Sequence, residues 1–151
     1  MNRFASPMSI ALDEARAAAA RGEVPVGAVI ADPHGRIVAQ AGNRTRELND
    51  PTAHAEILAL RQACAAANSE RLPGHTLWVT LEPCPMCAAA IGFARIARLY
   101  YGASDAKSGG VGQGPRIYAH PQCHHIPELY DGIAEQESAV ILREFFDSLR
   151  R

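Results

Sequence analysis

The chain carries His54-Ala55-Glu56 and, further along, Pro83-Cys84-Pro85-Met86-Cys87. Histidine nitrogen and cysteine sulfur are common zinc ligands in proteins, and these two motifs supply three of them. A purely structural zinc site has four protein ligands, whereas a catalytic site has three and leaves the fourth position to water. We therefore predict a catalytic zinc site with the ligands His54, Cys84 and Cys87, and with Glu56 as a carboxylate that does not bind the metal.

Both motifs also stand at expected helix starts. Asp50 or Thr52 is predicted to cap a helix whose first turn contains His54 and Glu56. Its apolar residues recur at helical spacing, at positions 57, 60, 64 and 67. A second helix is predicted over residues 84–93, after Glu82-Pro83 interrupts the β-rich run 76–81. Cys84 and Cys87 then lie on one face of its first turn. Two helix N-termini would point at the metal, where their positive ends favour thiolates.

The remaining pattern predicts an α/β fold. Strands 24–31 and 36–42 are expected to form an antiparallel hairpin around Asp32-Pro33-His34-Gly35. Alternation of strands and helices thereafter predicts parallel strands with helices packed on the sheet. The other expected elements are a helix over 6–22, a strand over 98–102, a fifth strand over 116–120, and a C-terminal helix with one apolar face (Ser138, Ile141, Leu142, Phe145, Phe146, Leu149). The glycine-rich segment 108–115 lacks a phosphate-loop ending and is interpreted as a flexible loop.

Length and composition predict one domain over residues 1–151. With 151 residues and 48% hydrophobic content, the chain can bury one adequate core. The net charge of -1 gives no overall attraction to nucleic acid or anionic membrane. Residues 1–9 show no basic segment followed by an apolar run, and no apolar stretch reaches membrane-spanning length. Four cysteines, two of them assigned to metal, fit a reducing compartment, so a cytoplasmic location is expected.

Five segments spread over most of the chain resemble bacterial tRNA-specific adenosine deaminases. They are Glu23 to Val29, Gly42-Asn43-Arg44, Asp50 to Glu56, Thr80 to Cys87 and Tyr101 to Lys107. Nucleobase deaminases of this superfamily share the H-x-E and P-C-x-x-C signature. The resemblance implies a three-layer α/β/α cytidine-deaminase-like fold, with a mixed five-stranded sheet and helices on both faces. It also implies one zinc ion per chain, a homodimer, and deamination of the wobble adenosine of an arginine tRNA anticodon to inosine.

The resemblance also implies roles for individual residues. Glu56 would be catalytic and move protons, while Asn43, Pro83 and Asp105 would bind the substrate nucleotide. Lys107, Phe146 and Arg150 are expected to contact RNA, since aromatic rings stack on splayed bases and cations meet phosphates. The chemistry suits these roles, because zinc makes water a nucleophile near neutral pH and an adjacent carboxylate can take up and return its proton.

Other interpretations of the same residues remain open. A lone Cys-x-x-Cys motif also suits a redox pair or half of a structural zinc site, for which Cys123, His124 or His125 would be a fourth ligand. Those three residues are interpreted instead as part of a surface or dimer-interface loop, and Cys64 as core. Two other functions also remain: a deaminase of a free base such as guanine, and a zinc-stabilised binding domain without turnover. Eight cations are candidates for a local basic surface: Arg44, Arg46, Arg95, Arg98, Lys107, Arg116, Arg150 and Arg151.

Overall fold

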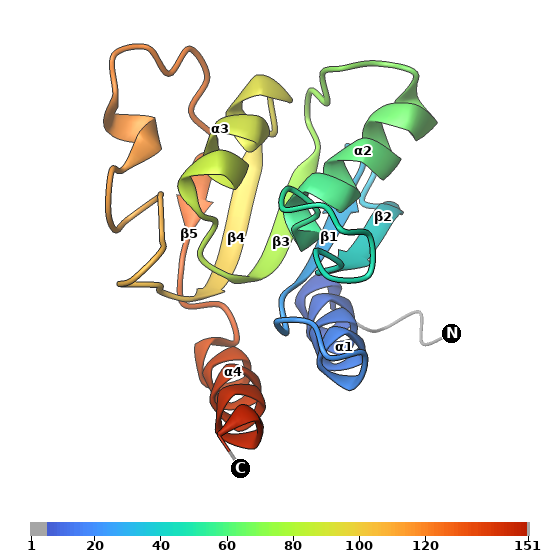
Figure 1. The fold of residues 1–151 in the computed structure, drawn as a ribbon. Coiled ribbons are helices and arrows are strands. Elements are labelled where there is room, and N and C mark those ends of the chain that lie inside the picture. Colours follow the sequence, from blue (N-terminus) through green and yellow to red (C-terminus); the bar gives the residue numbers. More distant parts are fainter. Residues whose placement is uncertain (1–5, 151) are drawn as a thin grey trace.

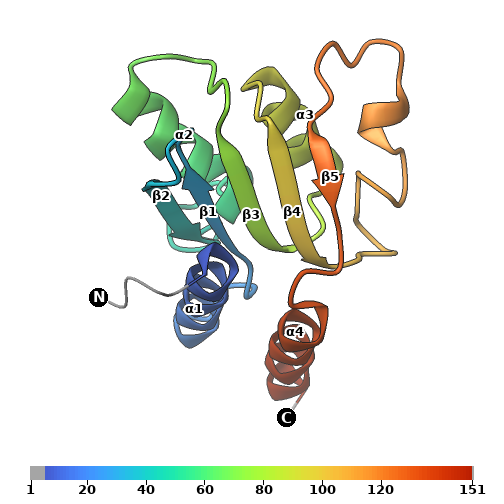
Figure 2. The same cartoon turned by 180° about the vertical axis from the view of Figure 1, so that it is seen from behind.

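The computed structural model describes residues 6–150 and has three layers around one sheet (Figures 1 and 2). Helices α1 (Pro7–Ala20) and α4 (Glu135–Leu149) contact one face of the sheet. Helices α2 (Ala55–Ala67) and α3 (Pro85–Phe93) lie on the other face, where they pack against each other. The predicted α/β/α layering, with helices on both faces, is confirmed.

The sheet is mixed and has five strands, as predicted, in the order β2-β1-β3-β4-β5. The strands are β1 (Gly27–Ala31), β2 (Ile37–Gly42), β3 (Thr76–Leu81), β4 (Arg98–Ala103) and β5 (Glu128–Tyr130). β1 is antiparallel to both β2 and β3, whereas β3, β4 and β5 run parallel to one another. The parallel half follows from the strand–helix alternation, because a helix between two strands returns the chain to the same end of the sheet.

The hairpin forms where it was predicted, but its first strand is shorter. Asp32 accepts hydrogen bonds from the backbone N–H groups of His34 and Arg36, which closes the turn between β1 and β2. The strand begins at Gly27 and not at Val24, because Pro25 has no N–H to donate and Val26 N–H bonds locally to the Val24 carbonyl.

The prediction of a fifth strand over residues 116–120 is wrong. The segment forms a short 3-10 helix, η1 (Ile117–Ala119), in which the buried Tyr118 donates its hydroxyl to the Ala88 carbonyl. The fifth strand is β5, a three-residue edge strand whose residues are all exposed. Such a short segment without a buried face leaves no apolar alternation in the sequence.

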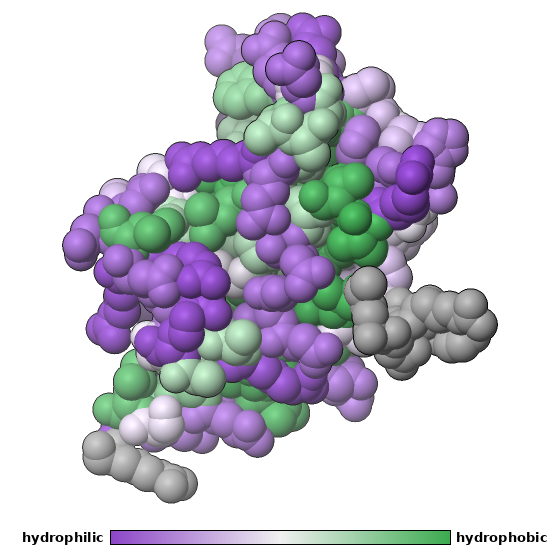
Figure 3. Space-filling view, turned by 90° about the vertical axis from the view of Figure 1, so that its right-hand side faces the viewer, coloured by the Kyte–Doolittle hydropathy of each residue, from purple (hydrophilic) through white to green (hydrophobic). Residues whose placement is uncertain are grey.

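The core lies mainly between the sheet and helices α2 and α3. It contains fully buried residues from every central strand, among them Ile30, Leu77 and Leu99. Cys64 packs against this cluster, as expected for a core cysteine. On the opposite face, a smaller cluster of Met8, Leu12 and neighbours from α1 covers β1. In the space-filling view of the side that carries β2, hydrophilic residues separate the hydrophobic patches from one another (Figure 3).

The C-terminal helix departs from its predicted apolar face. Phe145 is buried, but Phe146 is 43% exposed and Leu149 is 60% exposed. The turn containing Ser138 is anchored to the sheet, because the Ser138 hydroxyl accepts a hydrogen bond from the Ala103 N–H of β4. Only one side of the predicted stripe therefore contributes to the core, and the exposed residues remain free for other contacts.

Candidate active site

Each of the two helices α2 and α3 begins at a predicted metal ligand. His54 is the N-cap residue of α2 and Cys84 is the N-cap residue of α3, both with extended backbone conformation and no side-chain capping bond. The prediction that Asp50 or Thr52 caps α2 is wrong, because the Asp50 carboxylate instead closes a turn with the N–H and hydroxyl of Thr52. The cap positions thus leave the imidazole and the thiol free to bind a metal.

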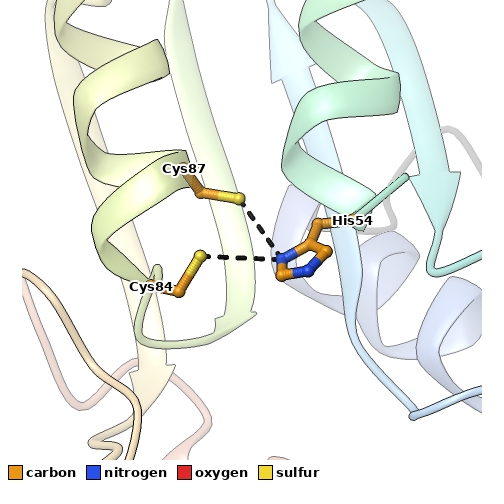
Figure 4. A group of neighbouring side chains, drawn as sticks. All are labelled: His54, Cys84 and Cys87. Atoms are coloured by element: carbon orange, nitrogen blue, oxygen red, sulfur yellow. Dashed lines mark hydrogen bonds between the residues drawn. The ribbon is translucent and has the colours of Figure 1, made fainter. Parts of the chain in front are cut away.

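The side chains of His54, Cys84 and Cys87 point toward one another across the gap between these helix starts (Figure 4). His54 Nδ1 lies 3.6 Å from Cys84 Sγ and 3.5 Å from Cys87 Sγ. The three ligand atoms all lie within 4.8 Å of one another, and within residues 6–150 no other group of three His, Cys, Asp or Glu side chains does so. One imidazole and two thiols in this arrangement fit zinc, with a fourth position left for a non-protein ligand.

Charge distribution within the cluster also suits a metal. Hydrogen bonds from Cys87 and His54 lower the pKa of the Cys84 thiol to about 4, and the Cys84 contact raises the pKa of His54. Cys87 is fully buried, and the neighbouring Cys84 sulfur together with burial raises the pKa of its thiol. Zinc binds thiolates, so metal binding would displace the remaining proton from Cys87.

Glu56 lies next to the cluster in the first turn of α2. It is 4% exposed, and burial raises the pKa of its carboxyl group to about 7. Such a group is well suited to accept and donate a proton near neutral pH. His54, Glu56 and Cys84 all line one cavity of about 800 Å³.

Most of the residues predicted to contact the substrate or RNA line the same cavity. Asn43, Asp105, Lys107, Phe146 and Arg150 line it. The predicted contact Pro83 is buried and does not line the cavity, although its carbonyl accepts a hydrogen bond from the Gly110 N–H of the neighbouring loop. The five predicted contacts come from three separate parts of the chain and line the same cavity as His54, Glu56 and Cys84.

The predicted basic surface is only partly assembled around this cavity. Of the eight cations proposed from the sequence, Lys107 and Arg150 line it, while Arg98 pairs with Glu128 on β5 and Arg95 lines a second cavity. Arg151 lies outside the described residues. Arg143, on α4, also lines the main cavity and was missed, because helical periodicity marked it only as a solvent-facing position.

Two buried carboxylates were also missed by the sequence analysis. Glu82 accepts five hydrogen bonds from the loop 104–113, and Glu23 accepts two from the loop 44–49. In both cases burial alone would raise the pKa of the carboxyl group, but the donated backbone hydrogen bonds outweigh it and hold the pKa below its usual range. Segment 108–115 forms a loop, as predicted, and hydrogen bonds to Glu82 anchor it at residues 111–113.

The residues Cys123, His124 and His125 lie apart from the metal cluster. The Cys123 thiol donates to the His125 carbonyl, and the His125 Nε2 is 2.7 Å from the Ile96 carbonyl oxygen. All three line the second cavity, of about 430 Å³, together with the exposed Phe93 of α3. They do not act as a fourth ligand to the cluster in this arrangement.

Similarity to known proteins assigns the family. Residues 1–103 match the cytidine and deoxycytidylate deaminase zinc-binding region. The chain is 62% identical over 143 residues to a tRNA-specific adenosine deaminase of Agrobacterium fabrum (strain C58 / ATCC 33970). The matched region covers 95% of this chain and 93% of that protein. The chain belongs to the tRNA-specific adenosine deaminase family.

Solved structures agree with membership of this deaminase family. A structure from studies of A-to-I editing by tRNA:A34 deaminases matches with a TM-score of 0.88 and 62% identity, covering 90% of this chain and 98% of that one. A guanine deaminase from Bacillus subtilis matches with a TM-score of 0.66 and 32% identity, over 99% of this chain and 94% of that one. The fold is thus shared with a free-base deaminase, while sequence similarity is greater to the tRNA-specific deaminases.

Proposed function

We propose that this chain is a zinc-dependent deaminase that converts adenosine to inosine at the wobble position of a tRNA anticodon. The observation that carries the proposal is the cavity, where the metal cluster and Glu56 meet exposed cations. Lys107 and Arg143 both line it, and within residues 6–150 neither forms an ion pair with a carboxylate. A free base has no phosphate for such cations to contact, whereas an anticodon loop has several.

The residues of the cluster would hold the zinc ion, and Glu56 would transfer protons. When bound, zinc supplies Lewis-acid chemistry that makes water a nucleophile near neutral pH. Glu56 takes a proton from the attacking water and delivers it to the purine N1 as C6 is attacked. It then takes the proton of the new C6 hydroxyl group and delivers it to the amino group, which leaves as ammonia while the C6 carbonyl forms. Asn43, whose side chain is almost fully buried and lines the cavity, hydrogen-bonds the purine edge.

The RNA contacts are assigned to residues that surround this centre. Phe146 presents an exposed ring on α4, suited to stack on a base of the loop, while Asp105 and Pro83 shape the nucleotide site. Lys107 and Arg150 meet phosphates, although Arg150 also contacts Asp147 at 3.4 Å. An anticodon loop already presents unstacked bases, so the enzyme can bind its target base at small energetic cost.

The proposal extends to stoichiometry, assembly and location. One zinc ion binds per chain, and the substrate is the arginine tRNA with adenosine at the wobble position. A homodimer would cover Phe93, which is 75% exposed on α3 beside the second cavity. We also propose that residues 1–151 form a single domain. A cytoplasmic location is supported by the four free cysteines, because disulfides are rare in reducing compartments. Among the helices of residues 6–150, none is long and apolar enough to cross a membrane.

Ammonia release from matched substrates tests the reaction and distinguishes it from the free-base alternative. The enzyme should deaminate an anticodon stem-loop far faster than free guanine, adenine or cytidine. Rapid guanine turnover without inosine formation in the stem-loop would assign the chain to the free-base deaminases. Absence of turnover on all four, from protein that binds zinc, would support a binding domain.

Replacing Lys107, the only lysine of the chain, tests the electrostatic part of the proposal. In Lys107→Ala, we expect weaker binding of the stem-loop and a salt dependence that is shallower by about 0.7 to 1 in the slope of log K against log salt concentration. The measurement is KM for the stem-loop at several salt concentrations. Arg36→Ala, which removes an exposed cation in the β1–β2 turn, is the control and should leave the slope unchanged. Equal slopes in Lys107→Ala and wild type would exclude a phosphate contact.

A further inference from the structure

The loop 104–113 supplies one wall of the substrate cavity. Ser104, Asp105, Lys107 and Ser108 all line the cavity, and none of them belongs to a helix or strand. A loop with three glycines among ten residues has little intrinsic preference for one conformation. Its position must therefore be imposed by contacts from outside the loop.

Those contacts converge on one carboxylate, that of Glu82. Oε1 accepts the Ser104 hydroxyl and the Asp105 N–H, both at 3.1 Å. Oε2 accepts the consecutive backbone N–H groups of residues 111, 112 and 113 at 3.1, 3.0 and 3.0 Å. Both ends of the loop are thus bound to the same side chain, which lies between the end of β3 and the ligand Cys84.

The geometry requires a carboxylate at this position. All five partners are donors, so the acceptor must have lone pairs on both of its terminal atoms, and an amide offers only one such atom. In Glu82→Gln the NH₂ group would face N–H or O–H donors on one side of the side chain. The loop also requires a glycine at position 109, which faces this carboxylate. A Cβ atom at Gly109 would overlap the Glu82 carboxylate.

Glu82 itself is not available to bind substrate. Although it borders the cavity, it is 2% exposed, and its two oxygens are already occupied by the five donors. Any effect of Glu82 on the substrate must therefore pass through the loop that it holds. This distinguishes it from Glu56, whose carboxylate faces the metal cluster.

We propose that Glu82 is a positioning residue that sets the affinity for the RNA substrate by holding Asp105 and Lys107 of the loop 104–113 in their binding positions. This inference rests on the proposed function for its substrate. The bonds are charge-assisted, and losing one such bond typically weakens an equilibrium by about tenfold or more. The loss should appear in substrate binding and leave the chemistry at Glu56 and the metal in place.

Glu82→Gln tests the proposal through two independent measurements. Amide hydrogen exchange should increase at residues 111–113 and leave the N-terminal turns of α2 and α3 protected, whatever the substrate of the enzyme is. On the anticodon stem-loop, KM should rise about tenfold or more, while kcat changes by less than about threefold and zinc content is unchanged. Glu82→Asp, which keeps the charge, should recover part of the KM. The exposed Glu70→Gln is the neutral control.

A double-mutant cycle with Lys107→Ala separates positioning from general destabilisation. If Glu82 acts by placing Lys107, the two KM effects should be less than additive. The matched control is Glu23→Gln, which removes a second buried carboxylate but releases the other loop, 44–49, so its effect should add to that of Lys107→Ala. Unchanged exchange at 111–113 would overturn the loop contact. Increased exchange with unchanged KM, or fully additive effects with Lys107→Ala, would reduce Glu82 to a structural residue.

Discussion

Glu56→Ala should keep its zinc and its fold and yet lose a factor of roughly 10² to 10⁴ in kcat/KM on an anticodon stem-loop. The substitution removes the carboxylate that lines the cavity in the first turn of α2, beside His54, without removing a metal ligand. Proton transfer to the purine N1 and to the leaving amino group would then depend on water. Initial rates with stem-loop substrate, together with metal analysis of the same preparation, measure both quantities.

The control for this substitution is Glu70→Ala, an exposed carboxylate that follows α2, which should retain full activity. Activity of Glu56→Ala within about tenfold of wild type would remove the proton-transfer role, because general acid–base catalysis contributes more than that. Loss of zinc together with activity would instead indicate that Glu56 supports the metal site.

His54→Ala is expected to reduce bound zinc from one equivalent per chain to none and to abolish turnover. His54 is the only nitrogen donor in the cluster, and two thiols without it leave an incomplete ligand set. Cys123→Ala is the matched control, since this thiol contacts the His125 carbonyl and lies outside the cluster. It should retain one zinc and wild-type activity.

Elemental analysis of both variants beside the wild type decides the zinc assignment. Two equivalents in the wild type, with one surviving in His54→Ala, would show a second metal site elsewhere in the chain. Loss of zinc from Cys123→Ala would indicate that the segment 123–125 supplies a zinc ligand. Either result would contradict the single three-ligand site.

The metal cluster could be predicted because its determinants are local in the sequence. Cys84 and Cys87 lie three residues apart at a helix start, and His54 opens the preceding helix, so short-range rules place all three side chains at helix N-termini. The alternation of strands and helices and the hairpin were predictable for the same reason, whereas the three-layer arrangement was implied by the resemblance to the deaminases. The alternation and the hairpin each depend on periodicity or turn residues within a few positions.

The supports of the cavity could not be predicted in this way. Glu82 bonds to residues 22 to 31 positions away, and Glu23 to residues 23 and 24 positions away, so their burial depends on loops brought together only by the complete fold. In the sequence both resemble ordinary surface carboxylates that stand one or two residues before a proline. Edge strand β5 was not predicted for a related reason. Its pairing with β4 is formed by backbone groups, and its side chains are exposed.

The most direct test of the account is the position of inosine in an RNA that offers a choice. A stem-loop with one adenosine at the wobble position and others elsewhere in the loop should be incubated with the zinc-loaded enzyme and sequenced, beside an assay on free guanine. The account predicts inosine at the wobble position alone, with negligible conversion of guanine. Inosine spread over the loop, or efficient guanine deamination with the RNA left unchanged, would contradict it.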